Sequence, residues 1–308
     1  MLTAETPVVA QPAFTPCASR FRKAGLKRSG HRSWRIAALL IVAAVLARGV
    51  ISTLVPLLPD ETYYWEWSRR LQAGYFDHPP GIALLIAMGT SLFGDTTFGV
   101  RFGPAIGAIV VHVSIVILAA RLAGPRAAVR AAVLGAVMPF SVLGLALATP
   151  DVALLASTSV ALVFLERALS SPIRSRRSLG WWTLTGVALG CAFLSKFTAG
   201  LLPVSLVIAC VVYAPLRARF TEPGPWVASA VALLLFAPVV VWNAGLNWIS
   251  FRFQLNHGFG GEENDQDVFA LVDKSGARFL PLCQVERSEV GVKELRLDTR
   301  PNPAPLAL

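Results

Sequence analysis

The chain has 308 residues, of which 55% are hydrophobic and 15% charged, and its mean hydropathy is +0.59. This composition is too apolar for an ordinary soluble domain, and it predicts a protein with the lipid bilayer as its partner. The net charge of +10 does not indicate nucleic acid binding, because the basic residues do not gather with stacking aromatics on a soluble face.

In chain order, residues 1–35 form a basic arm, and residues 36–260 hold seven apolar runs of about the 20 residues that a spanning helix needs. The pattern therefore predicts an all-α fold, a polytopic bundle of transmembrane helices. The fifth and sixth runs are either two short helices that break at Ser195 and Lys196 or one long span. The apolar segment 82–93 is too short to span easily and reads as an interfacial helix. The seven expected spans are 36–58, 97–120, 127–148, 152–169, 181–197, 198–215 and 226–244.

The arginines and lysines alternate with the acids along these spans. Basic residues precede the first span and follow the second, fourth and sixth, so they fall on one side, which the positive-inside rule assigns to the cytoplasm. We therefore expect a multi-pass protein of the cell (inner) membrane, with a cytoplasmic N-terminus. The acids collect in the opposite, external loops, of which the first, 59–96, is long.

Residues 261–308 change character. Nine of the eighteen acids lie there, and no apolar run could cross a membrane, so the sequence predicts a polar tail. A frameshifted or misassigned end would give the same pattern as a genuine short form.

The segment "LLPDETYYWEWSRRLQAGYFDHPPG" (57–81) interrupts the apolar chain with acids and aromatics. A helix that starts near Asp60 would place Asp60, Tyr64 and Trp67 on one face, with Glu61 beside them. One interpretation is a capped interfacial helix with solvated acids and an interface belt of aromatics. The other is an external carboxylate pair whose pKa is raised by lipid and aromatic rings, which suits a general base in transfer from a lipid carrier.

Five ordered motifs favour the second interpretation: "PDETYYWEWSRRLQAGYFDHPPG", "LFGDTTFGVRFGPAIGA", "ATPDVALL", "FLSKFTAGLL" and "WNAGLNWISFRFQLNHGFG". Together they resemble the membrane glycosyltransferases related to the protein O-mannosyltransferases and to the aminoarabinose transferase of lipid A. The resemblance implies a GT-C fold with interfacial helices in the first external loop. It also implies transfer of a sugar, with inversion, from a polyprenyl-phosphate donor to an external acceptor that is a protein, a lipid or a glycan.

The resemblance also implies roles for seven residues. Asp60 and Glu61 match the catalytic acidic pair, of which Asp60 is the base or orients the acceptor. The residues implied to bind the donor phosphate or the substrate are Asp77, His78, Arg101, Asp151 and Lys196.

Several alternatives stay open. The chain could be a carrier or flippase for a lipid-linked or anionic substrate, which predicts ionisable groups near the middle of the membrane. It could also be an inactive, truncated glycosyltransferase, because members of the resembled family continue through further spans. No cofactor is certain, although Mg²⁺ or Mn²⁺ held by Asp60, Asp77 and Asp151 would suit hard carboxylate oxygens. Arg48, inside the first span, is expected to pair with a carboxylate or a phosphate.

Overall fold

The structure is a computed structural model that describes residues 27–258, 283–284 and 296–297. Most of the predicted basic arm (1–35) and polar tail (261–308) lies outside these residues. The chain divides into two compact units, Met1–Gly245 and Leu246–Leu308. The helices of the first unit are α1 (Lys27–Leu54), α2 (Pro59–Ser68), α3 (Gly81–Phe93), α4 (Thr97–Ala123), α5 (Pro125–Val137), α6 (Pro150–Leu169), α7 (Arg176–Phe193), α8 (Leu201–Val212), α9 (Ala214–Arg217) and α10 (Pro223–Gly245).

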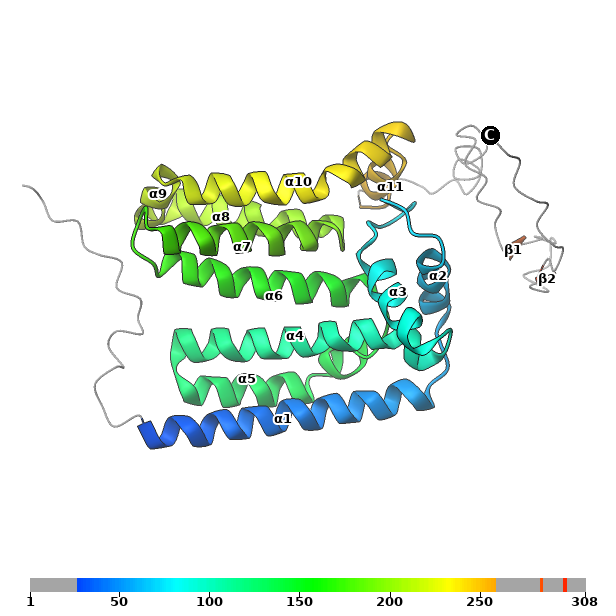
Figure 1. Cartoon of the computed structure of the whole chain (residues 1–308), viewed down its shortest axis with the longest axis horizontal. Coiled ribbons are helices and arrows are strands. Elements are labelled where there is room, and N and C mark those ends of the chain that lie inside the picture. Colours follow the sequence, from blue (N-terminus) through cyan, green and yellow to red (C-terminus); the bar gives the residue numbers. More distant parts are fainter. Residues whose placement is uncertain (1–26, 259–282, 285–295, 298–308) are drawn as a thin grey trace, which may run out of the picture. The chain divides into compact units, whose positions relative to one another are not determined.

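The first unit is a bundle of helices, which confirms the all-α prediction. Helix α1 packs on α4 and α5, α4 packs on α6, α6 packs on α7, and α7 packs on α10 (Figure 1). The two short helices α2 and α3 come from the predicted first external loop, and they gather at one end of the long helices (Figure 1). Short π and 3-10 turns at Phe140–Gly144, Phe197–Gly200 and Ala218–Thr221 complete the connections.

Four helices of the described residues are long and apolar enough to cross a membrane: His31–Leu54, Thr97–Ala123, Pro150–Leu169 and Pro223–Gly245. They coincide with four of the seven expected spans. The other three expected spans fall on α5, α7 and α8, which are shorter or less apolar, and their crossing of the membrane stays a prediction. The chain does break at Ser195 and Lys196, so the region 181–215 is two helices and not one long span.

The expected span 127–148 is not one helix. Helix α5 ends at Val137, Met138 is extended (φ −64°, ψ 126°), and a π-helical turn follows at Phe140–Gly144. Pro139 explains the break, because a proline disfavours helical geometry at the residue before it and has no N–H to continue the ladder. The correction matters for the site, because the chain from this turn leads directly into the first turn of α6.

The contact between α7 and α10 depends on a glycine. A Cβ added to Gly186 would lie 2.7 Å from Cα of Ala228 and even closer to its carbonyl oxygen. In the same helix, a Cβ at Gly180 would meet nothing within 4 Å. Only the first of these glycines is therefore needed for close helix packing.

The second unit is described by itself. It contains helix α11 (Ile249–Gly258) and two short antiparallel strands, β1 (Cys283–Gln284) and β2 (Arg296–Leu297). Cys283 pairs with Leu297, and Gln284 pairs with Arg296.

Candidate active site

The segment 59–96 is a folded platform and not a loose loop. Tyr64 and Trp67 on α2 are buried against Ile82 and Ile86 on α3 and Val100 on α4. Their rings therefore form a small core, which corrects the expectation that both belong to an interface belt. The expected helix near Asp60 and the helix near 82–93 are both confirmed.

The ends of the helices bring three predicted site residues, Asp60, Asp77 and Asp151, to the same end of the bundle, here called the acidic end, and Asp95 between α3 and α4 lies at this end as well. Asp60 and Asp151 lie in the first turns of α2 and α6. His78 precedes α3, and Lys196 follows α7. Helix direction alone therefore separates this end from the arginine-rich end, which holds Arg121, Arg126, Arg130, Arg167, Arg174, Arg176, Arg177, Arg217 and Arg219.

The start of α3 packs directly on the turn that carries Lys196. The Gly81 N–H donates to the carbonyl oxygen of Leu194 at 2.6 Å. A Cβ at Gly81 would lie 2.7 Å from that oxygen and 2.9 Å from Cα of Ser195, so only glycine fits. This close approach places the Asp77–His78 segment beside Lys196. The sequence reasoning missed Gly81, although a glycine directly after Pro79 and Pro80 was a visible signal.

Two polar contacts organise the site. Lys196 Nζ donates to Asp151 Oδ1 at 2.8 Å, and both side chains are partly exposed, at 28% and 43%. Tyr63 Oη donates to Asp77 Oδ1 at 3.3 Å. A partly exposed ion pair contributes roughly 0–1 kcal/mol, so an incoming phosphate can compete for the ammonium. Lys196 has three N–H donors, which leaves two for such a ligand.

Burial and charge shift the ionisation of the groups in this cluster. Burial raises the pKa of Asp77, and the neighbouring His78 charge and the Tyr63 hydrogen bond oppose the rise. Burial also lowers the pKa of His78, helped by the charge of Lys196 and opposed by Asp77 and Asp151. The pKa of Tyr64 is raised by burial and by Asp77, Asp60 and Asp151. These mutual effects mean that Asp60, Asp77, His78, Asp151 and Lys196 lie within electrostatic reach of one another.

Glu61 and Arg101 are engaged with each other and not with the cluster. Both side chains are almost fully buried, and they form a bidentate ion pair in which Arg101 Nε donates to Glu61 Oε1 at 2.7 Å. Glu61 also accepts from the backbone N–H groups of Leu58 (3.0 Å) and Ala148 (2.8 Å). Arg101 donates to the carbonyl oxygens of Ser52, Val55 and Pro56, at the end of α1.

This pair ties three helices together. It joins the end of α1 and the start of α2 to α4, and through Ala148 it holds the segment that leads to Asp151. Burial by itself raises the pKa of Glu61, but the hydrogen bonds and charge of Arg101 and the two backbone N–H groups outweigh it and lower the pKa. The expectation of a raised pKa is therefore wrong for Glu61.

Asp60 differs from Glu61 in both its burial and its hydrogen bonding. Its side chain is exposed at the first turn of α2, and among the described residues it has no hydrogen bond or ion pair. The two acids that are adjacent in sequence thus have opposite environments. One carboxylate holds helices together, and the other is exposed.

The carboxylates of the cluster do not assemble a metal site. Within the residues that the structure describes, no three His, Cys, Asp or Glu side chains lie close enough to hold a metal ion. Asp60, Asp77 and Asp151 are therefore not gathered into a three-ligand protein site, and no step below depends on a metal.

Arg48 donates hydrogen bonds to backbone carbonyl groups that the break after α5 leaves without helical partners. It is buried and donates to the carbonyl oxygen of Ser141 (2.8 Å) and contacts Nε2 of His112 (3.2 Å). His112 in turn contacts the carbonyl oxygen of Gly135, at the end of α5. Among the described residues Arg48 has no carboxylate partner, and it donates instead to carbonyl groups freed by the break at Pro139.

Fold and site together define a class: a multi-pass, all-α membrane protein of the GT-C type, with polar residues gathered at one end of the bundle. The family described as dolichyl-phosphate-mannose-protein mannosyltransferase matches residues 77–242, more than half of the chain. The chain therefore belongs to this family.

Curated relatives agree with this assignment. The chain is 32% identical over 240 residues to an undecaprenyl phosphate-α-4-amino-4-deoxy-L-arabinose arabinosyl transferase of Pseudomonas aeruginosa (strain LESB58), a match that covers 68% of this chain and 42% of the relative. It is 30% identical over 188 residues to the lipid A galacturonosyltransferase RgtD of Rhizobium johnstonii, covering 60% and 38%. The chain thus spans about two fifths of the length of these relatives.

Two solved structures share the fold. ArnT from Cupriavidus metallidurans, bound to undecaprenyl phosphate, superposes with a TM-score of 0.56 at 24% identity and covers 67% of this chain and 42% of its own. The Pmt1–Pmt2 complex of S. cerevisiae, bound to its sugar donor, has a TM-score of 0.53 at 19% identity and covers 72% and 34%. These likenesses confirm the predicted GT-C fold.

Proposed function

We propose that this chain carries the catalytic end of an inverting glycosyltransferase, which moves a sugar from a polyprenyl-phosphate donor to an acceptor on the outer side of the membrane. The observation that carries the proposal is that one end of the bundle holds both Asp60, an exposed carboxylate without a hydrogen bond among the described residues, and Lys196, a partly exposed cation whose ion pair is with Asp151. The names of the relatives support the same reaction, because they include transferases for undecaprenyl-phosphate-linked sugars.

Asp60 is the proposed base. It takes the proton from an acceptor hydroxyl or amine, whose oxygen or nitrogen attacks the anomeric carbon from the face opposite the donor phosphate. The new bond forms as the bond from the anomeric carbon to the phosphate oxygen breaks, and the electron pair leaves with the polyprenyl phosphate. A single displacement of this kind inverts the configuration. A base contributes about 10²–10⁴-fold to such a rate.

Lys196 and His78 are proposed to face the donor phosphate. Lys196 neutralises the charge that grows on the leaving group, and Asp151 holds the ammonium in place before the donor binds. The lowered pKa of His78 favours its neutral imidazole, so His78 is proposed as a hydrogen-bond donor to the phosphate and Lys196 as the cation. Asp77 positions Tyr63 through their hydrogen bond. Glu61 and Arg101 are assigned to the scaffold.

The test compares two carboxylates on the same helix. Membranes that contain the chain are given radiolabelled polyprenyl-phosphate sugars, and transfer is measured for the wild type, Asp60→Asn and Glu66→Gln. Glu66 lies on α2 and is partly exposed, and within the described part of the chain its ion pair is with the exposed Arg69. We expect a loss of at least 100-fold for Asp60→Asn and little change for Glu66→Gln.

Two results would contradict the proposal. Transfer that survives Asp60→Asn removes Asp60 as the base. Absence of transfer from a folded, membrane-inserted wild type would show that this chain by itself has no transferase activity.

The carrier hypothesis gains no support from the ionisable residues inside the bundle. Arg48 and His112 contact each other and the backbone carbonyl groups of Gly135 and Ser141, where the neighbouring helix is broken.

A further inference from the structure

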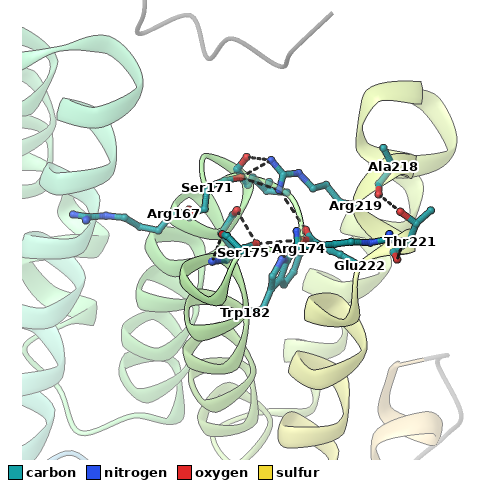
Figure 2. A network of polar contacts seen from close by, with 12 residues as sticks. Arg167, Ser171, Arg174, Ser175, Trp182, Ala218, Arg219, Thr221 and Glu222 are labelled. Carbon is teal, nitrogen blue, oxygen red and sulfur yellow. Dashed lines mark hydrogen bonds and ion pairs between the residues drawn. The ribbon is translucent and has the colours of Figure 1, made fainter. Parts of the chain in front are cut away.

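Among the described residues, the two acids of the arginine-rich end, Glu166 and Glu222, are engaged in internal contacts. Glu166 pairs with Arg121, and Glu222 is buried and accepts from the Arg174 N–H (3.0 Å), Trp182 Nε1 (3.2 Å) and Arg219 Nη1 (3.3 Å). Figure 2 shows this Glu222 network between α7 and the start of α10, with Arg167 directed away from it. Positive charge is therefore left over at this end.

A shallow hollow lies on α7 next to this surplus. Its volume is about 500 Å³, and it is lined by Arg177, Gly180, Trp181, Thr183 and Leu184. The missing side chain at Gly180 opens the surface, since nothing lies within 4 Å of a Cβ built there. Leu184 is 41% exposed, so the hollow has an apolar side as well as a basic rim.

Arg167, in the last turn of α6, faces the same indole. Its guanidinium lies 5.2 Å from the centre of the Trp181 ring, which is cation–π distance. Its Nε is buried, yet it has no hydrogen-bond partner among the described residues. A buried donor without an acceptor is unfavourable in protein interiors, so an acceptor is expected to reach it.

We propose that this hollow binds the phosphodiester head of an anionic phospholipid of the bilayer, such as phosphatidylglycerol. Arg167 and Arg177 bind the phosphate, the glycerol backbone lies against Trp181, and an acyl chain follows Leu184 along α7. A lipid fits better than free phosphate, because most of the lining surface is apolar and tryptophan favours the headgroup level of a membrane. The site lies at the opposite end of the bundle from Asp60 and does not depend on the proposed transfer.

The experiment measures retained lipid. The full chain is purified into micelles or nanodiscs that contain phosphatidylglycerol and phosphatidylcholine, and native mass spectrometry gives the apparent Kd for each lipid. Arg167→Gln/Arg177→Gln is compared with Arg126→Gln/Arg130→Gln, which removes the same charge from exposed positions of α5 at the same end. Arg167 and Arg177 contact the phosphate directly in this proposal, and a hydrogen bond to a charged group contributes roughly tenfold or more in affinity, so the first pair should weaken phosphatidylglycerol binding at least about twentyfold.

The control arginines do not contact the phosphate in this proposal and are screened by solvent, so the control pair should weaken binding less than about threefold. Arg167→Lys/Arg177→Lys, which keeps both charges, should restore most of the affinity and excludes misfolding as the cause. Phosphatidylglycerol with brominated chains should quench the tryptophan fluorescence of the wild type more than that of the Trp181→Phe variant. Equal weakening by the two glutamine pairs, equal retention of phosphatidylcholine, or displacement by glycerol 3-phosphate alone would overturn the proposal. So would occupation of the hollow by a second copy of the chain in the absence of lipid.

Discussion

Replacement of Glu61 by glutamine tests whether this acid supports the fold or takes part in the chemistry. Glu61 accepts four hydrogen bonds, two on each carboxylate oxygen: Arg101 Nε and Ala148 N reach Oε1, and Arg101 Nη2 and Leu58 N reach Oε2. A glutamine has one acceptor oxygen and one NH₂ donor. Whichever way the amide turns, its NH₂ group faces two donors, so two of the four bonds are lost and Arg101 keeps an uncompensated charge.

The magnitude follows from this geometry. Removing one partner of a buried ion pair typically destabilises a protein by about 3–5 kcal/mol. Arg101 keeps its bonds to the carbonyl oxygens of Ser52, Val55 and Pro56, which still stabilise part of its charge. We therefore expect the lower end, about 3 kcal/mol, or a fall in Tm of roughly 6–12 °C.

The assay is thermal unfolding of the purified chain in detergent, for Glu61→Gln, Arg101→Gln and the double variant. The double-variant cycle should give a coupling energy above about 1 kcal/mol, since both residues belong to one network. A Glu61→Gln variant that unfolds like the wild type but transfers no sugar would refute this reasoning and return Glu61 to the catalytic set.

Three further predictions follow from the packing and the charges. Gly81→Ala should push α3 away from the turn that carries Lys196 and so misplace the proposed donor site, which should reduce sugar transfer at least about tenfold. The control Gly200→Ala, whose Cβ meets nothing within 4 Å, should leave transfer nearly unchanged. Gly186→Ala should lower the free energy of unfolding by roughly 1–3 kcal/mol, because its Cβ overlaps α10. Gly180→Ala should raise the free energy of unfolding by up to about 1 kcal/mol, because alanine favours the helix more than glycine does. A comparison of the unfolding midpoints of the two variants with the wild type measures both effects. The pKa of His78 is lower in the folded state than its unfolded-state value of about 6.5. The stability that His78 contributes is therefore present above about pH 6.5 and is lost as the pH falls through the folded-state pKa. The fall in Tm between about pH 7.5 and 5.5 should be smaller for His78→Gln than for the wild type, and an equal fall would contradict this.

Part of the site could be predicted because its signals are local. Asp60 and Asp151 stand at helix starts, where the sequence pattern shows both the start of an apolar run and an acid in the first turn. Lys196 interrupts an apolar stretch, which marks a break between helices. Charge alternation along the spans placed these residues at one end of the bundle, because consecutive spans reverse direction.

The roles of Glu61 and Arg101 could not be predicted in this way. Their partners are backbone groups of Leu58, Ala148 and the end of α1, up to 87 residues away in sequence. No local pattern distinguishes a carboxylate that accepts such bonds from one that faces solvent. The same limit applies to Arg48, whose partner carbonyls become free only because Pro139 breaks the next helix.

The amino-acid sequence by itself determined the class of protein, the helical architecture, the end of the bundle where polar chemistry gathers and the family. These depend on composition, apolar run length and ordered motifs, which are properties of the chain before it folds. The tertiary structure decided which of two neighbouring acids is free, how Gly81 brings His78 to Lys196, and where Arg167 meets Trp181. Those outcomes depend on distances between segments far apart in the chain, and packing alone sets such distances.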